Sequence, residues 1–299
     1  MNDLTLVYYS ANAINPWFAE NVRAHLVTTA WDYPIISVTQ GPVGFGRNVD
    51  VGPLGQSVYN VYWQILLGAR LARTPYIACC EDDTLYSRGH LAYRPPPEMF
   101  AYNGQRWHLD PPVTGDDGAP PEKWRPARFR LRHRCGMCAC VVRTDYLLET
   151  LERRFAAYPR TGAETRLMHG WGEPGKFDHI VLKLPRVHRQ FFETPDSPVV
   201  TFNHPDSLQG LRKRNMTDRL AWELPIFGRA HDLWERMYAG SEAYSVRRAA
   251  PVGGRLEAER ESEHPYPPGA DSPAGDIGIG AGGSRESTGG AGLSAPVWG

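Results

Sequence analysis

Three consecutive carboxylates, Glu81, Asp82 and Asp83, directly follow a short apolar run from Tyr76 to Cys80. Such a run is typical of a buried strand, and open α/β sheets carry ligand-binding residues at the carboxyl ends of these strands. Adjacent acids repel one another, so a bound divalent cation would hold them together. Carboxylate oxygens favour Mg²⁺ or Mn²⁺, which commonly bind substrate phosphates. The pattern therefore predicts a metal site, with a solvated acidic turn as the alternative.

The elements before the acids predict a parallel sheet flanked by helices. A β-rich run from Leu4 to Tyr9 is followed by Asn15, a candidate N-cap, and by Pro16 at the first helical position. A second strand is expected over 34–39 and a second helix over 57–72. With the apolar run before the acids, this order of strands and helices favours an α/β fold.

The glycine-rich stretch 41–55 between the second strand and the second helix is expected to be a loop. It contains neither G-x-G-x-x-G nor G-x-x-x-x-G-K-[ST]. The sequence therefore lacks both the dinucleotide fingerprint and the P-loop at this position, the two commonest explanations for a nucleotide site there.

The sequence pattern changes after the acidic triplet. Asn103-Gly104 separates two β-rich runs, which is the strongest short-range signal for a hairpin. A strand is expected over 136–142 and a helix from Thr144 or Asp145 to about Ala157. Between them and the hairpin, arginines recur at mostly even spacing, which would place them on one face of an extended segment: Arg125, Arg128, Arg130, Arg132 and Arg134.

The last part of the folded region holds three further expected elements. Asp178 is a candidate N-cap for a short helix ending near Leu184, a strand over 199–202 is followed by His204, and a helix is expected near 230–239. From about residue 248, Gly, Pro, Ser, Ala and Glu dominate, which predicts a disordered tail over 248–299.

Composition narrows the possible environments. The formal net charge is zero, so no overall field draws the chain to nucleic acid or membrane. No apolar run approaches the roughly 18 residues needed to span a bilayer. The N-terminus lacks the basic region of a signal peptide, so we expect no membrane partner and a cytoplasmic location.

The five cysteines, an odd number without zinc-ligand spacing, are expected to be buried thiols.

The parallel first half, the strand that ends in Glu81-Asp82-Asp83, the hairpin and the mixed second half together resemble the GT-A glycosyltransferases, particularly family-2-like ones. The resemblance covers roughly 4–240, and its specific anchor is Asp82-Asp83, which matches the metal-binding DxD-type motif of that family. It implies a GT-A-like fold, a Rossmann-like mixed sheet flanked by helices, in one domain over 1–247. Residues 1–90 would form the nucleotide-sugar half and 91–247 the acceptor half.

The resemblance also implies roles for the acids. Because a strict Asp-x-Asp is missing, either Glu81 and Asp83 form the spaced acid pair or Asp82 and Asp83 act as adjacent ligands. Asp83 is expected to contact Mn²⁺ or Mg²⁺, and Asp82 the donor ribose or the outer sphere of the metal. His204, which follows the last strand, matches the late metal-ligating histidine that these enzymes often provide.

Substrate-binding and catalytic roles follow from the same resemblance. The end of the first strand, Tyr9, Ser10 and Ala11, is expected to line the nucleoside pocket. A general base should deprotonate the acceptor hydroxyl, with Asp178 as the first candidate and Glu173 as the second. Trp171 is expected to pack on an acceptor or donor ring.

Two basic segments, 125–134 and 212–214, suggest contacts with anions. Arg212 or Arg214 would bind the donor diphosphate. Arg130 and Arg132 would contact the acceptor, which could be DNA carrying a hydroxymethylated base, as in some viral systems. A saccharide or another small hydroxyl compound is the alternative acceptor, and a solvated surface is the remaining interpretation of the arginines.

The leading prediction is a metal-dependent glycosyltransferase that uses a nucleotide-diphosphate sugar. A sugar-phosphate nucleotidylyltransferase is the alternative, but it should show a glycine-rich signature with an Arg or Lys near the N-terminus, whereas Ser10-Ala11-Asn12-Ala13 follows the first strand. A metal-dependent nuclease would require further acids or a Lys beside the triplet. A non-catalytic nucleic-acid-binding module would leave the acids without a role.

Overall fold

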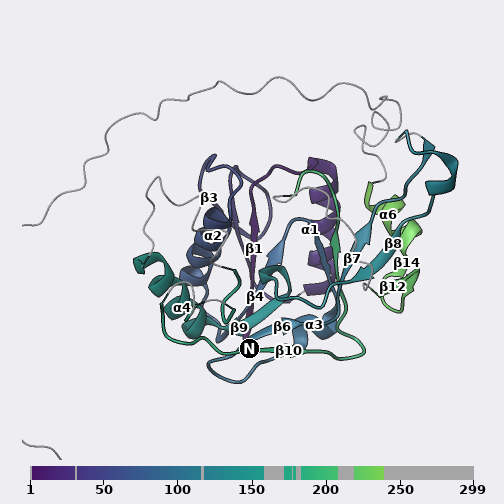
Figure 1. Cartoon of the computed structure of the whole chain (residues 1–299). Coiled ribbons are helices and arrows are strands. Elements are labelled where there is room, and N and C mark those ends of the chain that lie inside the picture. The colour runs from purple at the N-terminus through teal and green to yellow at the C-terminus, as the bar shows by residue number, and fades with distance from the viewer. Residues whose placement is uncertain are drawn as a thin grey trace, which may run out of the picture. The chain divides into compact units, whose positions relative to one another are not determined.

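In the computed structural model of the protein, strand β1 (Leu4–Ser10) lies inside a seven-stranded sheet of order β10-β6-β9-β4-β1-β2-β3 (Figure 1). The structure describes residues 2–30, 32–115, 118–157, 172–176, 178–179, 183–207 and 219–238. All of these fall in one unit of the chain, Met1–Gly253. The other strands of this sheet are β2 (Ile35–Thr39), β3 (Arg47–Asp50), β4 (Tyr76–Glu81), β6 (Phe100–Asn103), β9 (Cys140–Arg143) and β10 (Arg189–Phe192).

The sheet is mixed. Strand β1 runs parallel to β2 and β4, and β2 runs parallel to β3, whereas β9 is antiparallel to both of its neighbours, β4 and β6. The expected α/β class, a mixed sheet flanked by helices, is therefore confirmed. Because β1 and β4 are parallel neighbours in register, with Tyr9 opposite Glu81, their carboxyl ends lie side by side.

A second sheet of five strands has the order β12-β8-β7-β11-β5. Strand β5 follows the acidic triplet at once, so the triplet lies where the chain passes from the first sheet to the second. The remaining strands, β13 and β14, form a small antiparallel pair. The bounds are β5 (Thr84–Tyr86), β7 (Arg106–Asp110), β8 (Arg128–Leu131), β11 (Val199–Phe202), β12 (Leu220–Ala221), β13 (Glu223–Leu224) and β14 (Gly228–Arg229).

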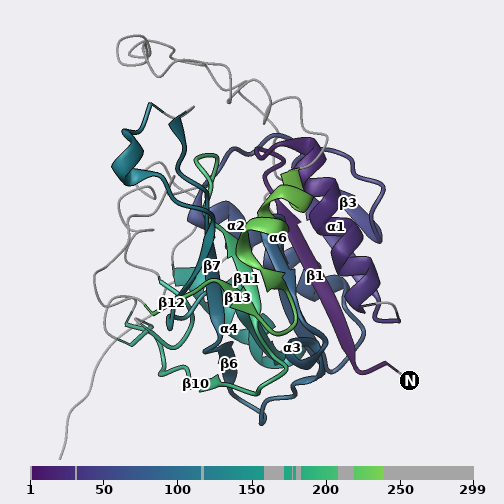
Figure 2. The same cartoon turned by 90° about the vertical axis from the view of Figure 1, so that its right-hand side faces the viewer.

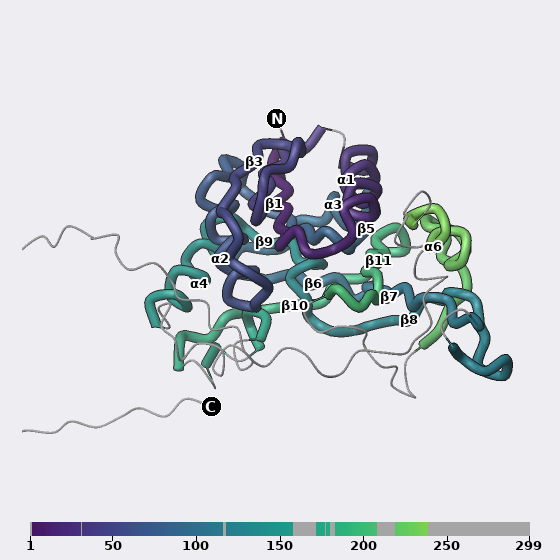
Figure 3. Tube along the Cα trace, turned by 90° about the horizontal axis from the view of Figure 1, so that it is seen from above, coloured from purple at the N-terminus to yellow at the C-terminus, as the bar shows by residue number. Residues whose placement is uncertain are grey.

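Helices cover both faces of the first sheet. The helices are α1 (Pro16–Ala30), α2 (Val58–Leu71), α3 (Arg88–Ala92), α4 (Thr144–Ala157) and α6 (Ala230–Tyr238), with short 3-10 turns η2 (Pro121–Lys123) and η3 (Met137–Ala139). Helices α2 and α4 lie on one side of the sheet and α1 on the other (Figure 3). Helix α6 lies beside α1 (Figure 2).

Alternation along β1 produces two separate apolar layers. Val7 and Tyr9 pack with residues of α2 and α4, whereas Leu6 and Tyr8 pack with Leu26 of α1 on the opposite face. A third cluster joins α1, the second sheet and α6. Burial on both faces explains why β1 and β4 are almost continuously apolar and not alternating.

Two helix starts were predictable from their caps. Asn15 Oδ1 accepts a hydrogen bond from the amide of Phe18 at 3.1 Å, and Ser57 Oγ accepts one from the amide of Asn60 at 3.0 Å. Helix α2 also lies very close to β1, because a Cβ atom at Gly68 would overlap the side chain of Val7. The cap at Ser57 thus fixes where α2 begins, and the missing Cβ at Gly68 allows α2 to pack closely on β1.

The predicted hairpin at Asn103-Gly104 is wrong. Strands β6 and β7 on either side belong to different sheets, where β6 pairs with β9 and β10 and β7 pairs with β8 and β11. Neither Asn103 nor Gly104 has the positive φ that a type I′ turn requires. Both strands are fully buried. The packing of β6 and β7 in two different sheets therefore outweighs the turn preference of Asn103-Gly104.

Other differences are smaller. The expected loop 41–55 contains the edge strand β3, and the expected strand 136–142 begins as the turn η3 before β9. The five cysteines are free and buried, as expected. The short helix expected from Asp178 to near Leu184 is wrong at its described positions: 178–179 form a turn, 183–184 are irregular, and Lys183 has a positive φ of 55° that a helix does not allow. Positions 180–182 and the tail 248–299 lie outside the described residues. Within the described part of the chain, no helix has the length and apolar character needed to cross a bilayer.

Candidate active site

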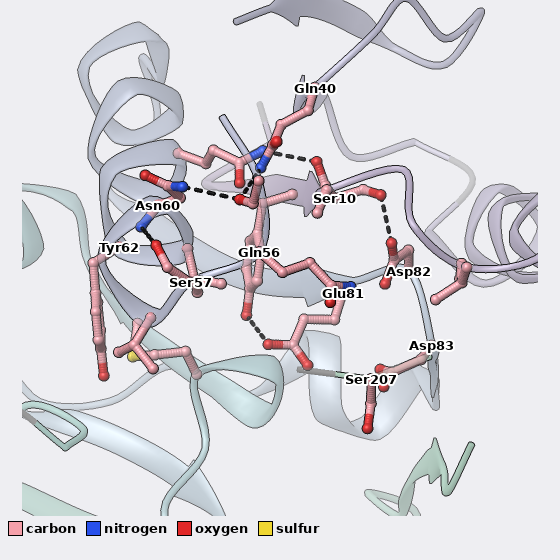
Figure 4. Close-up of a pocket in the computed structure, with 18 of the residues that line it drawn as sticks. Ser10, Gln40, Gln56, Ser57, Asn60, Tyr62, Glu81, Asp82, Asp83 and Ser207 are labelled. Atoms are coloured by element: carbon pink, nitrogen blue, oxygen red, sulfur yellow. Dashed lines mark hydrogen bonds between the residues drawn. The ribbon is translucent and has the colours of Figure 1, made fainter. Parts of the chain in front are cut away.

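A cleft of about 210 Å³ opens at the carboxyl ends of β1 and β4. Ser57 and Asn60 lie on the helix side of the cleft, whereas Asp82 and Asp83 lie on the opposite side (Figure 4). The lining residues include members of both predicted groups, the end of β1 and the acidic triplet. The structure therefore brings together Tyr9, Ser10, Ala11, Glu81, Asp82, Asp83, Glu173 and His204.

Two residues of β1 hydrogen-bond to the triplet. The hydroxyl of Tyr9 donates to Glu81 Oε1 at 2.8 Å, and the hydroxyl of Ser10 donates to Asp82 Oδ2. These contacts follow from the register, because Tyr9 is the direct neighbour of Glu81 across the two strands. The first two acids are thus oriented by neutral donors, and neither has a basic partner among the ion pairs of the described residues.

Burial and the charge of Asp83 raise the pKa values of Glu81 and Asp82. Burial raises the pKa of Glu81 to about 8, and the charge of Asp83 adds to the shift. Burial and the charge of Asp83 likewise raise the pKa of Asp82 to about 6, against the hydrogen bond from Ser10. This part of the cleft therefore holds more negative charge than its surroundings compensate.

His204 meets Asp83 from the second sheet. Its Nε2 lies 3.4 Å from Asp83 Oδ2. Burial alone would lower the pKa of His204, but the contact with Asp83 and the charges of Asp82 and Asp206 together outweigh burial and raise it. Strand β11, which precedes His204, pairs with β5, and the amide of Phe202 donates to the carbonyl of Asp83 at 2.9 Å. The backbone itself therefore holds the two side chains together.

Asp83 and His204 fit two neighbouring ligands of one divalent ion. Two donor atoms that share an ion at about 2.1 Å each lie roughly 3 Å apart, close to the observed 3.4 Å. No group of three or more His, Cys, Asp or Glu side chains among the described residues is arranged to hold a metal. A magnesium-like ion bound here would complete its sphere with water and substrate phosphates, as such ions usually do.

Amide side chains form the wall opposite the triplet, and sequence reasoning missed them. Gln64 Nε2 donates to the carbonyls of Ser10 and Val38 at 2.8 and 2.7 Å, which ties α2 to the ends of β1 and β2. Asn60 Nδ2 donates to the carbonyls of Leu54 and Gly55 at 2.8 and 2.9 Å. Polar residues at 57, 60 and 64, spaced three and four apart in an apolar helix, were the available signal.

A hydrogen bond joins two loops that line the cleft. Gln56 Nε2 donates to the carbonyl of Asp206 at 3.0 Å, which joins the loop before α2 to the loop after β11. Asp206 also lines the cleft. No lysine or arginine of the described residues lines it, so its charged side chains are five acids, Glu81, Asp82, Asp83, Glu173 and Asp206, and His204.

Several expected site residues lie elsewhere. Asp178 is 1% exposed and does not line the cleft; its Oδ1 accepts a hydrogen bond from Arg154 Nε at 2.7 Å. Arg130 is 0% exposed and pairs with Asp110 at 2.8 Å, and Arg132 is also buried. The even spacing of the arginines thus marks a partly buried face and not an exposed one, because β8 is an inner strand of the second sheet. Trp171, Arg212 and Arg214 lie outside the described residues.

No protein-family model and no curated protein matches the chain. Solved structures with a similar fold include a glycosyltransferase involved in the glycosylation of the major capsid of PBCV-1, which is 10% identical, has a TM-score of 0.37 and covers 67% of this chain and 93% of its own. A putative glucose-1-phosphate thymidylyltransferase from Bacillus anthracis in complex with sucrose is 8% identical, with a TM-score of 0.31 and coverages of 66% and 89%. TarS 1-349 from S. aureus is 9% identical, with a TM-score of 0.32 and coverages of 69% and 62%. Since these TM-scores lie below 0.5, the function has to be argued from the cleft.

Proposed function

We propose that this protein is a metal-dependent glycosyltransferase that moves a sugar from a nucleotide-diphosphate sugar to the hydroxyl of a saccharide or another small acceptor. The observation that carries the proposal is the charge of the cleft. Clustered carboxylates and His204 line it, and no lysine or arginine of the described residues does. A divalent cation would offset the repulsion between these acids and a diphosphate.

Asp83 and His204 are the residues that would hold the ion, Mn²⁺ or Mg²⁺. Their donor atoms lie 3.4 Å apart at the junction of the two sheets. When bound, the ion would supply positive charge that stabilises the departing diphosphate. Asp82, held by Ser10, faces the same cleft, and we assign it to the donor ribose. The end of β1 and the amide wall would then surround the nucleoside.

Glu173 is the general base of this proposal. It lines the cleft, and no described residue makes a hydrogen bond or an ion pair with its carboxylate. Asp178, the first candidate from sequence, has its carboxylate occupied by Arg154 and by the amide of Gly175. In the transfer step the acceptor oxygen forms a bond to the anomeric carbon and its proton passes to Glu173. The bond from the anomeric carbon to the diphosphate oxygen breaks, and its electron pair leaves with the nucleoside diphosphate.

A neutral acceptor fits the cleft better than DNA. The case for DNA used arginines that would contact phosphates, but Arg130 and Arg132 are buried, and Arg130 is neutralised by Asp110. An acidic cleft repels a polyanion. Hydroxyl groups of a sugar can instead hydrogen-bond to carboxylates and amides.

The test is donor turnover. The protein is incubated with UDP- and GDP-sugars and a panel of saccharides, with Mn²⁺ or with a chelator, and release of nucleoside diphosphate is followed. We expect metal-dependent release that falls at least about a thousandfold in Asp83→Ala. Asp232→Ala, an exposed acid on α6 outside the cleft, is the matched control and should keep full activity. If no nucleotide sugar binds, or if the chain makes pyrophosphate from a nucleoside triphosphate and a sugar phosphate, the proposal is wrong.

The base is tested by Glu173→Gln, which keeps the shape of the side chain and removes its proton affinity. We expect transfer to slow by roughly 10²- to 10⁴-fold, the usual contribution of a general base, while donor binding is unchanged. Single-turnover transfer and calorimetric donor titration separate the two effects. A variant with wild-type turnover would exclude Glu173 as the base.

A further inference from the structure

The segment 172–176 has no helix or strand, yet buried side chains hold it at three backbone positions. The carbonyl of Gly172 accepts hydrogen bonds from the hydroxyl of Tyr62 at 2.8 Å and from Arg154 Nη1 at 3.0 Å. The carbonyl of Pro174 accepts one from the hydroxyl of Tyr102 at 2.9 Å. An irregular segment with this many buried partners has little freedom to move.

The backbone amide of Gly175 is the third position at which the segment is held. It donates to Asp178 Oδ2 at 2.7 Å, while Asp178 Oδ1 accepts from Arg154 Nε, also at 2.7 Å. Arg154 and Asp178 are 0% and 1% exposed. The ion pair therefore closes a loop of contacts, because its two members each bind the backbone of the segment, one at Gly172 and the other at Gly175.

Stability alone is a poor explanation for this ion pair. Removing two charges from water costs several kcal/mol per ion, and apolar residues of similar volume are often as good or better. Arg154 comes from the body of α4 and lies 5.3 Å from the ring centre of Tyr62. Three distant parts of the chain, α2, β6 and α4, therefore converge on this short segment and fix its position.

Glu173 lies between the anchored positions, and its side chain lines the cleft. We propose that Arg154, Asp178, Tyr62 and Tyr102 are positioning residues that hold Glu173 at the acceptor hydroxyl. The inference rests on the proposed function, and it gives Asp178 a role different from the base suggested by sequence. With the backbone fixed on both sides, the Glu173 carboxylate can meet the acceptor proton with little loss of freedom in the transition state.

Tyr102→Phe is the sharpest test. Tyr102 is buried and does not line the cleft, so the substitution removes one hydroxyl from the scaffold, with its hydrogen bond to Pro174 and its contact at 3.9 Å with the sulfur of Met137. The control is Tyr146→Phe, because the Tyr146 hydroxyl also bonds a backbone group, the amide of His188 at 3.0 Å, away from the segment. We expect kcat for transfer to fall about tenfold in Tyr102→Phe with donor Kd unchanged, and neither to change in Tyr146→Phe. Thermal midpoints of the two variants should agree.

A double variant separates positioning from a general structural effect. If Tyr102 acts through Glu173, Tyr102→Phe should have no further effect on transfer in a Glu173→Gln background, whereas independent effects would multiply. Multiplied effects, or a Tyr102→Phe variant with wild-type kcat, would overturn the inference and leave the proposed function intact. Absence of transfer by the wild-type protein would reject the proposed function, and the inference with it.

Discussion

The carboxylates of this protein fall into two regions with opposite surroundings. Asp110 and Asp178 are buried and are paired with Arg130 and Arg154 at 2.8 and 2.7 Å. The triplet on the cleft has hydroxyl donors and His204 as partners, and no arginine or lysine in the described part of the chain forms an ion pair with it. The same side-chain chemistry is therefore neutralised in one region and left uncompensated in the other.

The difference indicates which acids serve the fold and which serve a ligand. A buried aspartate with its own arginine has no capacity left for a substrate. Three adjacent acids with one histidine in contact destabilise the protein by mutual repulsion, and such a cost is characteristic of functional sites. The comparison yields predictions for the free energy of unfolding with opposite signs in the two regions.

The largest expected effect lies in the paired region. Asp110→Ala removes the buried carboxylate that pairs with Arg130 and accepts a hydrogen bond from Asn203. We expect a loss of about 3–5 kcal/mol in the free energy of unfolding, measured by urea denaturation. Glu152→Ala is the control, because its pair with Arg70 is about half exposed and should contribute less than about 1 kcal/mol. Equal losses in the two variants would contradict the comparison.

His90, a buried titratable group with no counter-ion among the described residues, extends the comparison. Burial lowers the pKa of His90 to about 3, below its ordinary 6.5. Asn103 Nδ2 lies 3.1 Å from its Nδ1, and the rings of Tyr86 and Phe192 lie against it. The native ring stays neutral where the unfolded ring takes up a proton. Its contribution to stability is therefore complete above pH 6.5 and declines as the pH falls toward 3.

By pH 4.5 this single group should lower the free energy of unfolding by roughly 2–3 kcal/mol relative to pH 8. Urea denaturation of the wild type and of His90→Gln across this range measures the effect. The variant starts less stable at pH 8 but should lose less on acidification. If both proteins show the same pH slope, the buried ring is not the group that titrates.

The smallest expected effect, and the one of opposite sign, lies in the triplet. Asp82→Asn removes the charge beside Asp83 and keeps an oxygen to accept from Ser10. We expect a gain of about 1 kcal/mol in the free energy of unfolding at pH 7.5 without divalent ions. Parallel denaturation of the wild type in a chelator supplies the reference. A loss comparable to that of Asp110→Ala would show that the triplet is compensated after all.

Local signals in the sequence predicted the first half of the fold well. Asn15 and Ser57 mark helix starts by hydrogen bonds within a few residues, Pro16 does so by its fixed φ, and the structure confirms these starts. Asn103-Gly104 failed because the partners of β6 and β7 come from distant strands. Strand β3 was missed for the same reason, since its polar residues become a strand only by pairing with β2.

The site was predicted where it depends on two neighbouring strands and missed where residues from distant elements come together. The position of the triplet, and of Tyr9 and Ser10 opposite it, follows from two parallel strands in register. Gln64 needed the placement of α2, and the pairing of Asp178 with Arg154 needed the placement of α4. Spacing alone also cannot tell a buried arginine such as Arg130 from an exposed one, because both recur at every second residue of a strand.

The pairing of β5 with β11 has a consequence for synthesis. Thr84 and Thr201, whose hydroxyls lie 3.2 Å apart, are 117 positions apart in the chain. The ribosome delivers the acids long before the histidine, so a nascent chain carries the triplet without the partner that meets it. Contacts over such separations form slowly, which places completion of the cleft late in folding. A fragment that ends before β11 would display the acids without the cleft to which they belong.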